Sequence, residues 1–214
     1  MANILLMNPN SSTATTNAMV AIARQVLPGV TGWTAPSGSA LLTSIAALDA
    51  SATLVAAAEI PADTDGVIVS AFGDPGRAAL AARLGVPVVG IGQSAALAAS
   101  RGGRRYAVAT HTPTLVASID ALMRDSAPGG DYLGTFLTSG DPHELGADPE
   151  ALDAALLVAI TRAHAAGAEA VIIGGGPLGQ AAERLRDVAP PCEIIAPIPE
   201  AARLLARRLR PNRS

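Results

Sequence analysis

The chain contains no lysine, because all 15 of its basic residues are arginine. Schiff-base and pyridoxal chemistry both require a lysine amine, and a Walker-type phosphate loop requires its own lysine, so all three are excluded. The single cysteine, Cys192, excludes an internal disulfide and any CxxC site. Three widely separated histidines do not match a structural zinc site, and we predict neither a metal nor a cofactor.

Aromatic residues make up only 2% of the chain, and its net charge of −3 includes no basic block. Nucleic-acid binding needs stacking platforms and basic stripes, so we do not expect it. No apolar run approaches the roughly 20 residues that span a bilayer. The first residues, MANILLMNPN, lack the basic region of a signal peptide and are typical of a strand. We therefore expect a cytoplasmic protein with no membrane partner.

Half of the 214 residues are apolar and 15% are charged, which is typical of a folded globular chain. Short, nearly all-apolar segments alternate with alanine-rich helical stretches, as they do in α/β proteins with buried parallel strands. The expected strands are 3–8, 66–71, 87–92, 105–110, 170–175 and 193–198. The expected helices are 13–27, 43–58, 75–83, 93–101, 113–125, 149–166 and 200–210.

The sequence also repeats itself once. ILLMNPNSS at 4–12 is similar to YAVATHTPT at 106–114, and GVIVSAFG at 66–73 is similar to AVIIGGGP at 170–177. We therefore predict two pseudosymmetric lobes, 1–100 and 101–198, each a parallel, flavodoxin-like sheet flanked by helices. A last helix, 199–214, is expected to pack back on the first lobe. Ligands bind at the carboxyl ends of parallel strands, so the active site should be a cleft between the lobes.

Two strand-end loops carry amide, hydroxyl and imidazole groups. In the first, Asn10 and Ser11 precede a helix, where they can anchor a carboxylate or polar ring, or cap the helix. In the second, His111 lies between Thr110 and Thr112 and is either an acid or base in the cleft or a structural residue. The other histidines and the cysteine are interpreted as surface or structural residues: His143, His164 and Cys192.

Two further loops are rich in glycine. Asp74, in SAFGDPG at 70–76, is either a helix cap or a carboxylate base near the cleft. The segment GGGP at 174–177 lacks the spacing of a dinucleotide loop; its backbone amides can bind an oxyanion, or its glycines can allow close packing. The candidate substrate-binding residues here, with Gln93, are Ser70, Ala71, Phe72, Gly73, Gly175, Gly176 and Pro177.

Together these motifs resemble the aspartate/glutamate/hydantoin racemase superfamily, and its hydantoin racemase branch in particular. The matching segments occur in order over residues 3–205: NPNSS followed by Thr16, AFGDPG followed by GVPVVGIGQSAA, VATHTP, and AEAVIIGGGPLG. The resemblance implies two α/β lobes with a small substrate between them, bearing a carboxylate or a cyclic amide or carbonyl group. It also implies a cofactor-independent homo-oligomer.

Racemases of this family use two cysteines as proton donor and acceptor on opposite faces of an acidic carbon. The resemblance places these cysteines at Ala71 and Gly175, and neither of those residues can titrate. Gln93 and Ala196 likewise stand where the family has a glutamate and an aspartate. A two-thiol racemase is therefore excluded. Arylmalonate decarboxylase, which is similar to these racemases, has glycine at the first cysteine position and protonates with the second.

Three functions remain open. The first is an enzyme that stabilises an enolate without thiols, as an isomerase, a lyase such as a decarboxylase, or a cyclase, with His111 or Asp74 moving the proton. The second is a catalytically inactive ligand-binding protein. The third is a hydantoin or amino-acid racemase whose two cysteines have been replaced. We favour the first because the polar loops of the expected site are intact.

Overall fold

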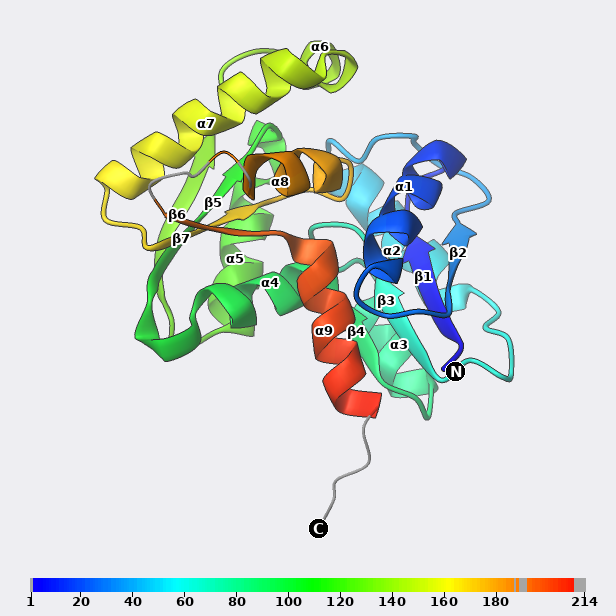
Figure 1. Cartoon of the computed structure of the whole chain (residues 1–214). Coiled ribbons are helices and arrows are strands. Elements are labelled where there is room, and N and C mark those ends of the chain that lie inside the picture. The colour runs from blue at the N-terminus through cyan, green and yellow to red at the C-terminus, as the bar shows by residue number, and fades with distance from the viewer. Residues whose placement is uncertain (1, 187, 189–191, 210–214) are drawn as a thin grey trace.

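The computed structural model describes residues 2–186, 188 and 192–209, which form two α/β lobes side by side (Figure 1). Each lobe is built on a parallel four-stranded sheet, which confirms the predicted fold class. The central strands are buried along nearly their whole length. Their side chains are apolar on both faces, as a sheet covered by helices on both sides requires.

The first lobe has the strand order β2-β1-β3-β4. Its strands are β1 (Ile4–Asn8), β2 (Val30–Thr34), β3 (Gly66–Val69) and β4 (Val88–Gly90). Its helices are α1 (Thr13–Arg24), α2 (Ile45–Ala57), α3 (Arg77–Arg83) and α4 (Ile91–Ala99). Ser12 caps α1, because its side chain accepts a hydrogen bond from the amide of Thr15.

The second lobe follows the short helix η1 (Arg101–Gly103) and has the order β6-β5-β7-β8. Its strands are β5 (Arg105–Thr110), β6 (Asp131–Leu137), β7 (Ala170–Ile173) and β8 (Glu193–Ile195). Its helices are η2 (Pro113–Leu115), α5 (Val116–Ser126), α6 (Pro142–Ala147), α7 (Pro149–Ala165) and α8 (Gly179–Arg186). Counted from the first strand of each lobe, the two orders are the same, so the sequence repeat is also a structural repeat.

The sequence predicts six strands, whereas the described residues form eight. The two additional strands, β2 and β6, lie at the outer edges of their sheets. Most residues of β2 and all residues of β6 are at least partly exposed. These strands therefore lack the continuous apolar run by which a buried strand is recognised. The helices α6 and α8, which are short, are also absent from the prediction.

The last helix, α9 (Pro197–Leu209), follows the second sheet and packs on α1, α4, β3 and β4 of the first lobe. Leu205 is fully buried in this contact, and a Cβ on Gly66 would lie only 2.9 Å from its Cδ1 atom. The main core cluster contains residues of both lobes and of α9, so the lobes share one core. Of the expected helix 199–214, residues 210–214 lie outside the described part of the chain.

Asp74 attaches the loop after β3 to the beginning of α4. Its carboxylate accepts hydrogen bonds from the backbone amides of Gly92, at 2.8 Å, and Gln93, at 2.7 Å. A cap at Asp74 would be expected on the helix that follows it directly, but that helix begins after Gly76, and Asp74 caps α4 instead. Burial raises the pKa of Asp74 to about 6, although both amides and Arg77, 3.9 Å away, act to lower it.

We expect Leu205→Ala to lower the free energy of unfolding by about 3 kcal/mol, because it leaves a cavity between α9 and β3. Arg207→Ala, on the exposed face of the same helix, should change it by less than about 0.5 kcal/mol. Urea denaturation followed by circular dichroism measures both. Equal effects of the two substitutions would contradict the described packing of α9.

The pKa of Asp74 predicts a pH-dependent stability. Because the folded-state pKa of about 6 lies above the ordinary value of 3.8, the folded chain binds this proton first as the pH falls. The unfolding free energy of the wild type, relative to Asp74→Asn, should therefore rise between pH 7 and pH 4, by at most about 3 kcal/mol. Denaturant titrations of both proteins at four pH values measure it. The raised pKa would be contradicted if the unfolding free energy of the wild type, relative to that of Asp74→Asn, fell between pH 7 and pH 4.

Candidate functional site

A pocket lies between the two lobes, at the carboxyl ends of their strands. The predicted site residues in its wall are Asn10, Ser70, Ala71 and Phe72 from the first lobe, and His111, Thr112, Gly175, Gly176 and Pro177 from the second. Its volume is about 40 Å³. The pocket in this form suits a small ligand.

Asn8, at the end of β1, holds the polar wall of the first lobe in place. Its side-chain nitrogen, Nδ2, donates to Oδ1 of Asn10 at 2.7 Å and to the hydroxyl of Thr16 at 3.0 Å. Oδ1 of Asn10 also accepts the backbone amide of Ser12 at 2.9 Å. Since two donors occupy this oxygen, Nδ2 is the group of Asn10 that is left to donate to a ligand. In this loop Ser12 caps α1, whereas Asn10 lines the pocket.

His111 is the only titratable residue in the described pocket wall, and it is only 4% exposed. It directly follows β5. Behind it, Thr110 donates to the carbonyl of Gly174 at 2.7 Å, and its hydroxyl lies 3.1 Å from that of Thr112. These bonds attach the end of β5 to the glycine segment after β7. His111 and Thr112 are therefore carried by a well-anchored part of the second lobe.

The glycines at 174 and 176 allow the second lobe to approach the first closely. A Cβ on Gly174 would lie 2.9 Å from the ring of Phe72, and a Cβ on Gly176 would lie 3.0 Å from the carbonyl oxygen of Ser70. Gly175 has a φ of +152°, and a Cβ there would lie 3.1 Å from the side chain of Leu178. Close packing therefore explains these glycines. The same backbone also forms pocket wall, so packing and ligand binding are compatible roles.

The remaining candidates lie beside the pocket rather than in its described wall: Ser11, Gly73, Asp74, Gln93 and Thr110. Asp74 has a left-handed backbone, with φ of +48°, and its carboxylate binds the first turn of α4. A Cβ on Gly90 would collide with that carboxylate. Asp74 thus anchors the loop that carries Ala71 and Phe72, and it is not among the residues of the described pocket wall. Gln93 contributes its backbone amide to the same contact.

Part of the apolar wall of the pocket is not predicted from the sequence. These residues are Leu41, Leu42, Leu48, Leu115 and Ile119. Leu41 and Leu42 follow the edge strand β2, so recognising that strand would have indicated another strand-end loop at the cleft. The other three residues lie on helices and are typical of core positions. No local signal in the sequence separates them from the core.

Of the predicted surface and structural residues, His164 and Cys192 are not part of the described pocket wall. His164 is exposed on α7, where its Nδ1 atom lies 3.2 Å from the carbonyl of Ala168. The side chain of His143 lies outside the described part of the chain. Cys192 is half-buried directly before β8, at the amino end of the sheet, and burial raises the pKa of its thiol.

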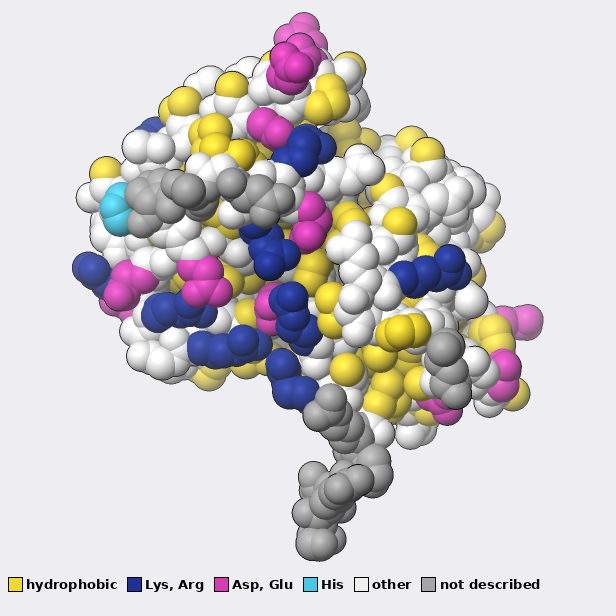
Figure 2. Space-filling view, in the orientation of Figure 1, with side chains coloured by type: hydrophobic (Ala, Val, Ile, Leu, Met, Phe, Trp, Pro, Cys, Tyr) yellow, Lys and Arg dark blue, Asp and Glu magenta, His cyan; other side chains and the backbone are white. Residues whose placement is uncertain are grey.

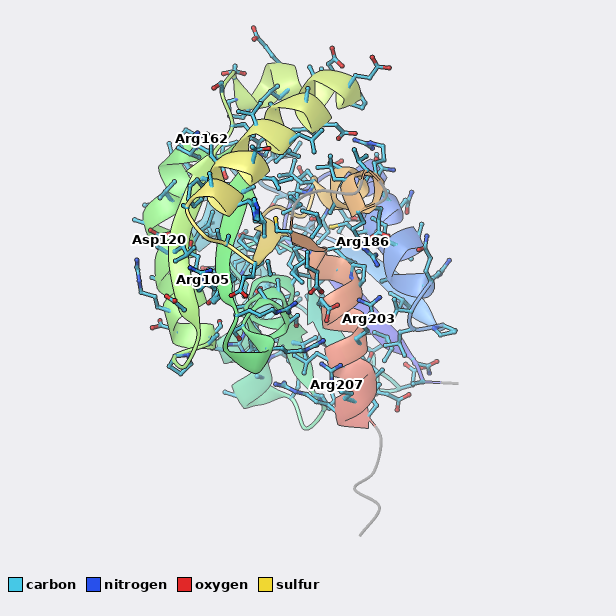
Figure 3. The ribbon with its side chains drawn as sticks, turned by 60° about the vertical axis from the view of Figure 1, so that its left-hand side comes forward. Arg105, Asp120, Arg162, Arg186, Arg203 and Arg207 are labelled. Atoms are coloured by element: carbon cyan, nitrogen blue, oxygen red, sulfur yellow. The ribbon has the colours of Figure 1, made fainter. Side chains whose placement is uncertain are left out.

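The described pocket wall contains no Asp, Glu or Arg. Figure 2 shows arginines on the surface around α9, and Figure 3 shows Arg203 and Arg207 along that helix and Arg162 on α7.

Among the described residues, no three His, Cys, Asp or Glu side chains are grouped to hold a metal ion. The described helices include none that is suited to cross a membrane. The pocket combines hydrogen-bond donors with one imidazole, a set that can stabilise an oxyanion and move one proton.

A sequence search of curated proteins finds no match to this chain. Among solved structures, allantoin racemase from Klebsiella pneumoniae is 21% identical, with a TM-score of 0.86 over 97% of this chain and 87% of that one. Allantoin racemase from Pseudomonas fluorescens is 24% identical, with a TM-score of 0.83 over 96% and 89%. A double mutant of arylmalonate decarboxylase is 14% identical, with a TM-score of 0.64 over 99% and 94%. These likenesses establish the fold.

The sequence profile of the Asp/Glu/hydantoin racemase family matches residues 4–205. The match extends over both sheets and all the loops that line the pocket. It agrees with the ordered motifs from which the resemblance was inferred. The chain therefore belongs to the Asp/Glu/hydantoin racemase family.

Proposed function

We propose that this protein is an enzyme that stabilises an enolate or oxyanion between its lobes and moves the proton with His111 instead of thiols. The observation that carries the proposal is a buried imidazole in a wall whose expected thiol positions hold Ala71 and Gly175. The substrate is a small carbonyl or carboxylate compound. The reaction is an isomerisation, a decarboxylation or other lyase reaction, or a cyclisation.

Three groups are suited to bind the negative oxygen. Asn10 offers its Nδ2 group, and Thr112 offers a hydroxyl that is held near Thr110. The backbone of Gly175 and Gly176 supplies amides in the same wall. Fixed donors in a largely apolar surrounding interact more strongly with a developing oxyanion than water does, because they need not reorganise.

A single imidazole favours some of these reactions over others. Inversion at carbon needs a donor and an acceptor on opposite faces, whereas the described wall offers one titratable group. In a decarboxylation, the bond to the carboxylate breaks, its electron pair enters the enolate, carbon dioxide leaves and His111 supplies one proton to carbon. A proton transfer along one face of a substrate also needs a single carrier. We therefore favour a lyase, or an isomerase that transfers a proton along one face of its substrate, over a racemase.

The backbone at Gly175 bears on the alternative of a cysteine-replaced racemase. A φ of +152° is a conformation that residues with a Cβ rarely adopt, and Leu178 occupies the space that a side chain would need. Ala71 has no such restriction. The two positions are thus unequal, which supports a site built without the second thiol rather than one from which a thiol was removed.

We expect His111→Ala to lower kcat by roughly 10²–10⁴, because it removes the proton carrier. The measurement is proton NMR in D₂O with a panel of 5-substituted hydantoins, aspartate, glutamate, aryl and alkyl malonates, and β-keto acids. It records deuterium uptake at carbon, loss of carbon dioxide and new ring signals. His164→Ala is the matched control, since it removes an exposed imidazole on α7, and it should retain full activity.

Each outcome of this experiment distinguishes the candidate functions. Turnover that survives in His111→Ala would refute the role of His111. Line broadening of a compound without any turnover in the wild type would favour the inactive ligand-binding protein. Conversion that depends on His111 but not on His164 would support the proposed enzyme.

The two expected thiol positions should respond differently to cysteine. Ala71→Cys should change the free energy of unfolding by less than about 1 kcal/mol, since the pocket borders this residue. Gly175→Cys should lower it by about 1–3 kcal/mol, because of backbone strain and the contact with Leu178. Gly175→Ala separates the effect of Cβ from that of sulfur. Chemical denaturation measures all three, and equal tolerance at both positions would favour a cysteine-replaced racemase.

A further inference from the structure

The segment 35–44, with the sequence APSGSALLTS, connects β2 to α2 without helix or strand and contains no charged residue. Residues 36–40 are exposed, whereas Leu41 and Leu42 turn back and form part of the pocket wall. In Figure 1 this light-blue stretch runs along the upper edge of the first lobe toward the second. A loop of the first lobe thus supplies apolar wall to a pocket shared by both lobes.

Both ends of the segment are firmly held. At its beginning, Ala35 is buried, and its amide donates to the carbonyl of Asn8 at 3.0 Å. At its end, Ser44 caps α2 by accepting the amide of Ala47 at 3.2 Å. Fixed ends with an irregular, exposed middle allow a loop to swing as a unit, while the elements at either side remain in place.

Two further contacts hold the middle of the segment down. On the first lobe, the amide of Ser11 donates to the carbonyl of Ser39 at 3.1 Å, and its hydroxyl donates to that of Gly38 at 3.0 Å. On the second lobe, the hydroxyl of Thr114 donates to the carbonyl of Thr43. The Thr114 bond joins the two lobes directly beside Leu41 and Leu42.

We propose that residues 35–44 form a lid that closes the pocket by bridging the two lobes, with Ser11 and Thr114 as its two latches. Leu41 and Leu42 are the part of the lid that faces the ligand. With the lid down, the pocket volume of about 40 Å³ is well below the roughly 150 Å³ of a cavity that holds benzene, so a ring-bearing substrate needs the lid to lift before it can bind. Only the identity of the pocket as the substrate site rests on the proposed function.

Limited proteolysis of the free protein tests the lid without any substrate. Thermolysin cleaves before leucine, so cleavage ahead of Leu41 or Leu42 reports the open form. Loss of one hydrogen bond should raise the open population, and with it the initial cleavage rate at these sites, by about fivefold. We expect this of Thr114→Val, which keeps the shape of the side chain, and of Ser11→Ala. Mass spectrometry identifies the sites of cleavage.

Thr161→Val is the matched control, because it removes an exposed hydroxyl from α7 that bonds only within its helix, at 2.8 Å to the carbonyl of Leu157. Its cleavage rate at the lid should equal that of the wild type. Circular dichroism verifies that each variant is folded, and Ser11→Ala keeps the test valid if Thr114→Val is not. Unchanged cleavage in every folded latch variant, or no cleavage within 35–44 at all, would overturn the lid. Because no turnover is measured, this result is independent of the test on His111.

Discussion

The pocket depends on how closely the backbone of residues 174–176 approaches the first lobe. A Cβ on Gly174 would lie 2.9 Å from the ring of Phe72, and one on Gly176 would lie 3.0 Å from the carbonyl oxygen of Ser70. At these distances a side chain would push the lobes apart. A larger separation would move Asn10 away from the imidazole on the opposite wall. The glycines therefore set the spacing across which any ligand has to be bound, and they keep the pocket small.

The same constraint affects the chemistry of the wall. At residues 174–176 the second lobe presents main-chain atoms and no side chain to the first lobe. The position of this backbone therefore depends on the groups that hold it. Thr110 fixes the carbonyl of Gly174 at 2.7 Å, which holds the segment against β5. Asp74 fixes the opposing loop through the first turn of α4. In the proposed function these two anchors keep the donors aligned with a developing negative charge, so little reorganisation is needed when it forms.

The sequence predicts the fold from its apolar runs, because strands buried on both faces must be apolar throughout. It misses β2 and β6, since these two edge strands carry exposed residues and lose that signal. The edge strands β4 and β8 are mostly buried and keep it. The polar candidates Asn10 and His111 were identifiable because they directly follow buried strands, and both lie in the pocket wall. Leu48 was not, because an apolar residue on a helix has the same local pattern whether it faces a core or a pocket. Asp74 shows a similar limit, since the amides it caps lie within reach only in the folded chain.

The absence of Arg, Asp and Glu from the described wall bears on which substrates the proposed enzyme can process. A zwitterionic amino acid would bring an ammonium group into this wall, and no carboxylate side chain faces it there. A neutral cyclic amide or a monoanion loses less hydration energy on binding. For a monoanionic carboxylate, the apolar contacts of Leu42 and Ile119 also act on the reaction: the localised charge of the bound anion is poorly solvated, whereas the charge of the decarboxylation transition state is spread over more atoms. The wall that binds such an anion weakly therefore favours the loss of its carboxylate, which is the branch of the proposed chemistry that one imidazole can complete.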